Sequence, residues 1–189
     1  PKLPELIKYL KSLETTKSIF LVTNGQEPDM IQRLADEDAL PTQLYLSTNA
    51  ADQNSFLKIN RPRYDDSWKR WNETLELLSS LDTRTVLRIT LIKNWNDSEK
   101  MIPSFTEMFD KSNPHFIEIK SYMHIGRSTN RLEHENMLDM DEVRSFASGV
   151  SQHSNRFSVM DESEISRIVI LQNKKRFTDR YLSAYQETN

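Results

Sequence analysis

Short runs of branched and aromatic residues alternate along the chain with longer stretches whose apolar residues recur at helical spacing. Five runs are apolar at nearly every position, as in strands covered on both faces; they are residues 18–23, 43–47, 85–92, 115–120 and 167–171. Strands that alternate with amphipathic stretches are typical of parallel βα units. The pattern therefore predicts an α/β fold with a parallel sheet covered by helices on both sides.

Amphipathic helices are predicted between these strands and ahead of the first one, at residues 3–13, 66–81 and from about 141 onward. Two stripes at helical spacing are expected to face the core: Trp68, Trp71, Leu75 and Leu78, and then Val143, Phe146, Ala147 and Val150. Asn96 and Glu99 resemble a capping box that opens a helix through Phe109. Pro103 within that helix predicts a kink or a later start.

The order of elements has a consequence for the completeness of the fold. A parallel barrel or doubly wound sheet normally opens with a strand, whereas this chain opens with a helix and begins at Pro1 rather than Met. We therefore expect that upstream βα units are missing from this chain. With few glycines and no repeat or low-complexity tract, residues 1–189 are interpreted as one domain, with a terminal strand and tail near 157–189.

Composition excludes several classes of site. The chain has no cysteine, which excludes disulfides, thiolate zinc sites, a cysteine nucleophile and an iron–sulfur cluster held by its own thiolates. Its histidines form no H-E-x-x-H motif, so we predict no metal site, and there is no P-loop, G-x-G-x-x-G or G-x-S-x-G motif. The longest apolar run, Ile19 to Val22, has four residues, and no signal peptide pattern is present; we expect a cytoplasmic protein without membrane contact.

Polar residues follow four of the predicted strands. The strands run into Thr23-Asn24-Gly25, Ser47-Thr48-Asn49, Lys93-Asn94 and Lys120-Ser121-Tyr122, and Arg88 lies inside the third strand, where a charge needs a partner or a ligand. Each group alone fits a helix cap or a solvated loop, but carboxyl ends of parallel strands converge, so four together favour a site. Lys93 or Lys120, if desolvated there, could form a Schiff base with a carbonyl substrate.

Basic residues are locally dense and interleaved with aromatic ones. They gather at residues 58–70, around Arg127 and Arg131, and at 174–176, with Tyr64, Trp68 and Trp71 among the first group. This mixture could hold phosphates and stack bases. A solvated helix face with the tryptophans in the core explains the same pattern.

Six segments, in this order and spacing, resemble the radical S-adenosylmethionine family of tRNA 4-demethylwyosine synthases. They are residues 23–25, 41–47, 59–62, 84–93, 116–120 and 161–167. The segments 122–126 and 130–132 are closer to the archaeal form, which lacks a flavodoxin-like domain. The resemblance covers about residues 19–171.

This resemblance implies a partial parallel (β/α) barrel that binds S-adenosylmethionine and a 4Fe-4S cluster. It implies an enzyme of the carbon–carbon lyase type whose deoxyadenosyl radical acts on N1-methylguanosine of tRNA-Phe, with pyruvate supplying two carbons and an external electron donor. We expect a monomer. The residues that the resemblance places toward S-adenosylmethionine are Asn24, Ser47, Asn49, Arg88 and Lys120, and the candidates for tRNA phosphate contacts are Arg61, Arg127 and Arg131.

The chain also departs from the family pattern. The cluster motif C-x-x-x-C-x-x-C and the Gly-Glu motif are absent, and Ser47-Thr48-Asn49-Ala50 stands where the family has Ser-Val-Asp-Ala. Asn49 keeps hydrogen bonding but lacks the charge that an aspartate offers an ammonium group. The interpretation is a carboxyl-terminal portion, about four of six βα units, that is inactive alone. The alternatives are a cluster-less tRNA-binding module and an unrelated Schiff-base lyase using Lys93 or Lys120.

Overall fold

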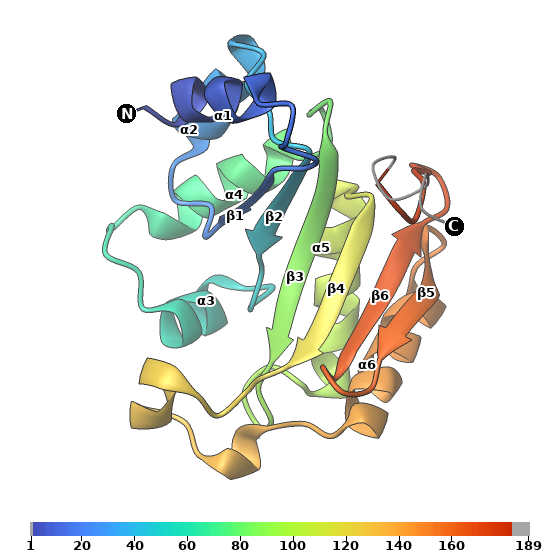
Figure 1. Ribbon diagram of the computed structural model, residues 1–189. Helices are drawn as coiled ribbons and strands as arrows, with labels where there is room; N and C mark the ends of the chain where they lie inside the picture. Colours follow the sequence, from blue (N-terminus) through green and yellow to red (C-terminus); the bar gives the residue numbers. More distant parts are fainter. Residues whose placement is uncertain (1, 183–189) are drawn as a thin grey trace.

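One six-stranded sheet forms the centre of the computed structural model, which describes residues 2–182 (Figure 1). The strands lie in the order β1-β2-β3-β4-β6-β5. Their bounds are β1 (Phe20–Thr23), β2 (Gln43–Ser47), β3 (Arg84–Leu91), β4 (Phe116–Ser121), β5 (Phe157–Ser163) and β6 (Ile168–Asn173).

The first four strands are parallel, as predicted, but the last two are not. β6 runs antiparallel to β4 and to β5, so the prediction of a parallel strand at 167–171 is wrong in direction. Only residues 164–167 join β5 to β6, and so short a connection can return the chain only in the opposite direction. β5 itself was not predicted, because charged residues interrupt its apolar pattern. The predicted tail is described to Leu182, and residues 183–189 lie outside the described part.

Helices cover one face of the sheet. In Figure 1, α4, α5 and α6 lie behind it, and none of these helices covers the face toward the viewer. The tail after β6 contacts part of that face, where Arg84 donates to the Arg180 backbone oxygen. The helices are α1 (Leu3–Ser12), α2 (Pro28–Asp36), α3 (Gln53–Asn60), α4 (Ser67–Leu77), α5 (Ile102–Ser112) and α6 (Met140–His153), with 3-10 turns η1 (Glu99–Met101), η2 (Gly126–Asn130) and η3 (His134–Asn136). Within residues 2–182, no helix combines the length and hydropathy that a membrane span needs.

The uncovered face corrects the expectation of a sheet covered on both sides. Phe20 and Val22, which alternate with inward residues along β1, are 55% and 51% exposed. β1 pairs only with β2, so it is an edge strand. The described chain is therefore an open, partial barrel whose concave interior is accessible.

Both predicted apolar stripes pack into the core. Trp71, Leu75 and Leu78 are buried, as are the four residues of the α6 stripe. Trp68 stacks on Trp71 with ring centroids 5.3 Å apart. The two tryptophans therefore support the packing of α4, and the interpretation of them as base-stacking residues is not needed.

Asn96 has a different role from the predicted one. α5 begins at Ile102, with Pro103 in its first turn, which confirms the later start. The predicted capping box is wrong, because the buried Asn96 side chain accepts from the Ile92 backbone N–H (2.6 Å) and donates to the backbone oxygens of Asn49 and Thr90 (both 2.9 Å). Asn96 thus ties together the carboxyl ends of β2 and β3.

Candidate binding site at the carboxyl ends of the strands

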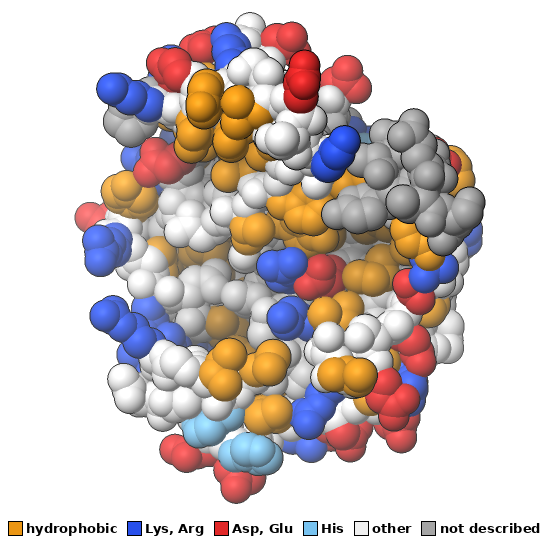
Figure 2. Space-filling view, in the orientation of Figure 1, with side chains coloured by type: hydrophobic (Ala, Val, Ile, Leu, Met, Phe, Trp, Pro, Cys, Tyr) orange, Lys and Arg blue, Asp and Glu red, His pale blue; other side chains and the backbone are white. Residues whose placement is uncertain are grey.

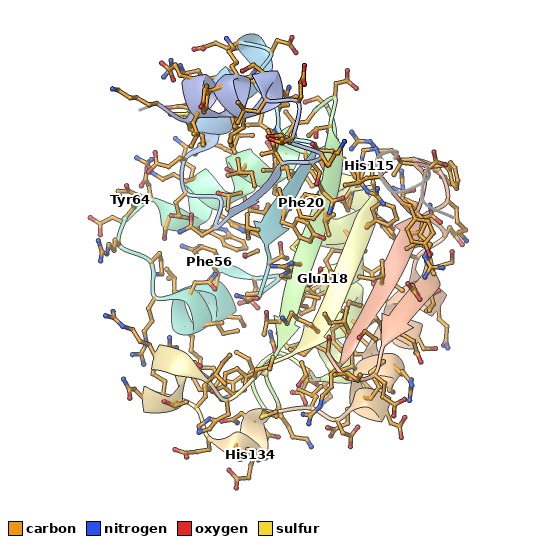
Figure 3. The ribbon with its side chains drawn as sticks, viewed as in Figure 1. Phe20, Phe56, Tyr64, His115, Glu118 and His134 are labelled. Atoms are coloured by element: carbon orange, nitrogen blue, oxygen red, sulfur yellow. The ribbon has the colours of Figure 1, made fainter. Side chains whose placement is uncertain are left out.

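A cavity of about 800 Å³ lies where β1 and β2 end, against the connection from α3 to α4. Figure 3 labels two of its residues, Phe56 on α3 and Tyr64 on the connecting loop. The lining residues are Asn24, Gln26, Glu27, Ser47, Asn49, Phe56, Asn60, Arg61, Pro62, Arg63 and Tyr64. Four of the predicted site residues, Asn24, Ser47, Asn49 and Arg61, therefore share one cavity.

The turn after β1 presents Asn24 to this cavity. Gly25 has φ +74°, and a Cβ there would lie 2.7 Å from Leu46 Cδ1, so this position requires glycine. The Asn24 side-chain oxygen Oδ1 accepts from the Gln26 backbone N–H (3.2 Å), and the Thr74 hydroxyl donates to the Gly25 backbone oxygen (2.9 Å). The turn is thereby fixed on α4. No described residue accepts a hydrogen bond from the Asn24 amide nitrogen, which is left to donate into the cavity.

Two polar residues at the end of β2, Ser47 and Asn49, differ in how many of their side-chain donors and acceptors already have partners. The Ser47 backbone oxygen accepts from Trp71 Nε1 (3.2 Å), but its hydroxyl has no partner among the described residues. Asn49 accepts from the Thr90 backbone N–H (3.1 Å) and donates to Asn60 Oδ1 (3.2 Å). The Asn49 side chain therefore holds the ends of β2, β3 and α3 together. One lone pair of its oxygen and one of its N–H groups remain for a ligand.

Arg61 sits at the end of α3 in an unusual conformation. Its φ of 46° and ψ of 59° are left-handed, and Pro62 follows it. No described residue contacts the side chain of Arg61 or that of Arg63 by hydrogen bond or ion pair. Two unpaired guanidinium groups thus stand at the rim of the cavity, which fits an anion.

Tyr64 is held at the same rim by charged neighbours. Its hydroxyl donates to Glu27 Oε1 (2.9 Å), and this hydrogen bond raises the pKa of Tyr64. The Arg70 guanidinium lies 4.5 Å from the ring centroid, and it is itself fixed by Asp66 Oδ1 (2.8 Å) and the Gln26 backbone oxygen (3.3 Å). Tyr64 is 45% exposed, so it offers a positioned aromatic surface.

Arg88 and Lys120 lie on the uncovered face of the sheet and are not among the residues that line the cavity. Arg88 makes a two-point contact with Glu118, through Nε (2.7 Å) and Nη2 (3.3 Å), and its guanidinium lies 4.4 Å from the Tyr45 ring centroid. Glu118, labelled near the middle of the sheet in Figure 3, is the partner that a strand arginine needs. Sequence reasoning missed this pair because the two residues are thirty positions apart.

The two arginines after β4 have separate environments. Arg131 donates through Nη2 to the backbone oxygens of Lys58 and Ile59 (both 3.2 Å), which fastens this segment to the end of α3. Arg127 in η2 is exposed and has no partner among the described residues. Figure 2 shows Lys and Arg side chains along this edge of the molecule. Arg131 therefore has a structural role, and Arg61, Arg63 and Arg127 keep their charges available.

Lys93 does not have the environment that Schiff-base chemistry needs. Its ammonium pairs with Glu142 of α6 at 2.5 Å, and this hydrogen bond raises the pKa of Lys93. A nucleophilic lysine needs a lowered pKa. The geometry at Lys93 therefore argues against Lys93 as the Schiff-base lysine of the lyase alternative, and Lys120 stays the other candidate for that role.

The residues of the cavity fit one of the two expected cofactors. Free donors on Asn24 and Ser47 beside an apolar wall at Phe56 suit the ribose and base of an adenosyl group. An iron–sulfur cluster does not fit, because the chain has no cysteine and residues 2–182 hold no group of three His, Asp or Glu side chains that could bind a metal ion. Sequence reasoning also missed Gln26, Phe56 and Asn60; Gln26 follows the Asn24-Gly25 turn, which was the available signal.

Comparisons with known proteins bear on the family of this chain. The family described as "Wyosine base formation" matches residues 111–173. The S-adenosyl-L-methionine-dependent tRNA 4-demethylwyosine synthases of Pyrococcus abyssi and Methanocaldococcus jannaschii are 40% and 39% identical over 80% and 93% of this chain. The resemblance to the tRNA 4-demethylwyosine synthases is confirmed. The chain spans about half the length of these two relatives, 44% and 52% respectively.

Solved structures support the same family and the same fold. A structure of TYW1 with a lysine-pyruvate adduct bound superposes with a TM-score of 0.79 at 36% identity, over 93% of this chain and 53% of that one. Coproporphyrinogen III oxidase from Escherichia coli, described as a radical SAM enzyme, reaches a TM-score of 0.52 over 89% of this chain and 39% of that one, at 14% identity, which bears on the fold alone. The open sheet is thus a partial barrel of the radical S-adenosylmethionine type.

Proposed function

We propose that this chain serves in the synthesis of 4-demethylwyosine on tRNA, as part of an S-adenosylmethionine-dependent radical enzyme. The proposal takes residues 1–189 as one domain, since a single sheet runs through the described residues. The observation that carries it is the meeting of Asn24, Ser47, Asn49 and Arg61 in one cavity at the carboxyl ends of β1 and β2. Ligands of parallel α/β folds bind at this end of the strands.

In this proposal the cavity binds S-adenosylmethionine and positions the nucleoside to be modified. Asn24 and Ser47 donate hydrogen bonds to the cofactor, and Asn49 fixes the strand ends. Arg61, Arg63 and Arg127 hold tRNA phosphates. Bound in this cavity, S-adenosylmethionine would supply radical chemistry for a carbon–carbon lyase-type reaction of N1-methylguanosine in tRNA-Phe with pyruvate; the cluster and the electron donor for that chemistry would have to be provided by groups other than the residues of this chain. The cluster ligands come from outside these 189 residues, so we expect the chain alone to be inactive.

A cluster-less tRNA-binding module is the second candidate. It is favoured by the absence of cysteine together with the unpaired arginines at the cavity rim. Such a module would bind tRNA with a marked salt dependence but would perform no chemistry.

A chimera separates the two candidates. The matching half of the Methanocaldococcus jannaschii relative is replaced with this chain, and cellular tRNA-Phe is examined by mass spectrometry for the tricyclic base. The synthase proposal predicts product from the chimera and much less from the same chimera carrying Ser47→Val with Asn24→Leu. A chimera that folds and binds tRNA but makes no product contradicts the synthase proposal and favours the binding module.

A further inference from the structure

The rim of the cavity holds a backbone conformation that costs free energy. Arg61 is left-handed at φ 46° and precedes Pro62, and each condition disfavours this backbone for a residue with a side chain. Glycine or asparagine is the usual residue at such a helix end. Strained positions that persist next to cavities are candidates for function. At this left-handed position, Arg61 lines the cavity with a guanidinium that has no partner among the described residues.

Tyr64, three positions later, complements that charge. Arg70 lies against its ring at 4.5 Å, Glu27 holds its hydroxyl, and nearly half of the side chain is exposed. An aromatic ring fixed in this way is suited to stacking with a base, because stacking needs a positioned, accessible π-face. Arg63 adds a second unpaired charge between the two residues. The Glu27 carboxylate lies at the same rim, and its pairing with Tyr64 and, at 4.0 Å, with Arg70 offsets its repulsion of a phosphate.

Gln26 supplies an independent sign of a ligand. The residue is only 8% exposed and lines the same cavity. Its Nε2 donates to the Ser67 backbone oxygen (3.1 Å), which fixes the orientation of the amide, but its Oε1 is buried with no partner among the described residues. Buried acceptors normally have donors. If the rim shifts slightly, a ligand N–H can reach this oxygen and donate the hydrogen bond that it lacks.

We propose that the segment from Arg61 to Tyr64 binds a single unpaired purine nucleotide of the RNA substrate. Arg61 and Arg63 hold its phosphate, its base stacks on Tyr64, and its N–H edge faces Gln26. The proposal rests on the proposed function in tRNA modification and assigns a specific place to one nucleotide. Arg70 is a positioning residue that acts through Tyr64.

Binding of two RNA probes to the 189-residue chain tests this assignment. The probes are a fluorescein-labelled hairpin with an unpaired purine-rich loop and the same stem extended as a continuous duplex, and the affinity is measured by fluorescence anisotropy at several salt concentrations. Wild type should prefer the hairpin. Tyr64→Leu should weaken hairpin binding by about tenfold and remove the preference, because base stacking is lost.

Arg61→Gly gives the most specific readout. It should weaken hairpin binding by about tenfold and lower the salt slope by roughly 0.7, while the melting temperature stays level or rises as the left-handed strain is relieved. Arg167→Gly is the matched control, because Arg167 also has a positive φ (49°) but lies in the β5–β6 turn and donates to the Leu138 oxygen instead. The hairpin affinity of Arg167→Gly should differ from that of wild type by less than about twofold, because this variant loses only a charge that is remote from the proposed site.

The outcomes separate this proposal from the proposed function. Wild type and both variants, Arg61→Gly and Tyr64→Leu, could show the same preference for the hairpin over the duplex. In that case the assignment of the nucleotide site is wrong, but the chain still binds RNA. If wild type binds neither probe, both proposals fail. If saturating S-adenosylmethionine displaces the hairpin, cofactor and nucleotide occupy the same place, which overturns the assignment of Tyr64 to RNA.

Discussion

The two ends of the sheet use polar residues in opposite ways. At the amino ends of the strands, Arg176 donates to the backbone oxygens of Leu78 (2.8 Å), Leu81 (2.8 Å) and Asn113 (2.9 Å). At the carboxyl ends, Asn24, Ser47, Arg61 and Arg63 keep donors for which no described residue provides an acceptor. The number of arginines in a region therefore does not locate a site. Saturated donors hold the fold, and unsaturated donors beside a cavity are available to a ligand.

The amino end should lose the most stability when its donors are removed. Arg176→Met keeps the apolar stem but leaves three backbone oxygens without their charged donor, so the free energy of unfolding should fall by about 3 kcal/mol. Urea denaturation measures the change, and Lys175→Met, at an exposed neighbour, is the control. A loss equal to that of the control would show that the three hydrogen bonds of Arg176 do not stabilise the amino end.

At the carboxyl end, the backbone turn rather than the polar side chains should carry the stability. Gly25→Ala forces a left-handed alanine and places its Cβ 2.7 Å from Leu46 Cδ1 and 3.0 Å from Trp71 Cδ1. The free energy of unfolding should fall by about 2 kcal/mol. Gly126→Ala is a matched control, because Gly126 also has positive φ but has open space around its Cβ position. Its loss, read by urea denaturation, should be clearly smaller, and equal losses would contradict the packing argument.

His115 should make the amino end sensitive to acid. Burial, with Arg176 and Arg84 nearby, lowers the pKa of His115 from 6.5 to about 4, and its Nδ1 accepts from the Thr85 backbone N–H at 3.1 Å. Because the folded pKa is below the unfolded one, the unfolded chain takes up the proton first as pH falls. The contribution of His115 is complete above pH 6.5 and is lost between pH 6.5 and 4.

With half-burial and solvent screening taken into account, this loss should amount to about 1.5 kcal/mol. The free energy of unfolding, measured by urea denaturation at several pH values, should decline less steeply with falling pH in His115→Asn than in wild type. Asparagine retains a hydrogen-bond acceptor but does not take up a proton in this range. An unchanged slope in that variant would show that His115 is already solvated in the native state.

The smallest change in stability is expected where the function is proposed. The Ser47 hydroxyl has no partner in the described structure, so Ser47→Ala should alter the free energy of unfolding by less than about 0.5 kcal/mol. Binding of S-adenosylmethionine, followed by equilibrium dialysis, should nevertheless weaken severalfold. Thr48→Ala is the contrasting variant, because Thr48 is buried and donates to Leu46; it should cost more stability than Ser47→Ala. Undiminished cofactor binding in Ser47→Ala would remove this residue from the site.

The strands and core stripes could be predicted because their evidence is local. Branched runs at 43–47 and 84–91 and the helical spacing of Trp71, Leu75 and Leu78 need only neighbouring residues. The reversal of β6 could not be predicted, because it follows from the short connection to β5, whose apolar pattern charged residues interrupt. The partner of Arg88 could not be predicted, because it depends on which strand lies beside β3. The polar strand ends indicated a site, and Asn24, Ser47, Asn49 and Arg61 do meet. Gln26 escaped notice because an unpaired acceptor is visible only in three dimensions.

The direct test of the account is chemical-shift mapping of the amide-labelled chain as the RNA hairpin and S-adenosylmethionine are added. The perturbed backbone amides should cluster at residues 24–27, 47–49 and 60–64, around the carboxyl-end cavity. Amides near His115 and Arg176 should keep their positions. Perturbations centred on that amino end, with the cavity residues silent, would contradict the central claim that the unpaired donors mark the binding site.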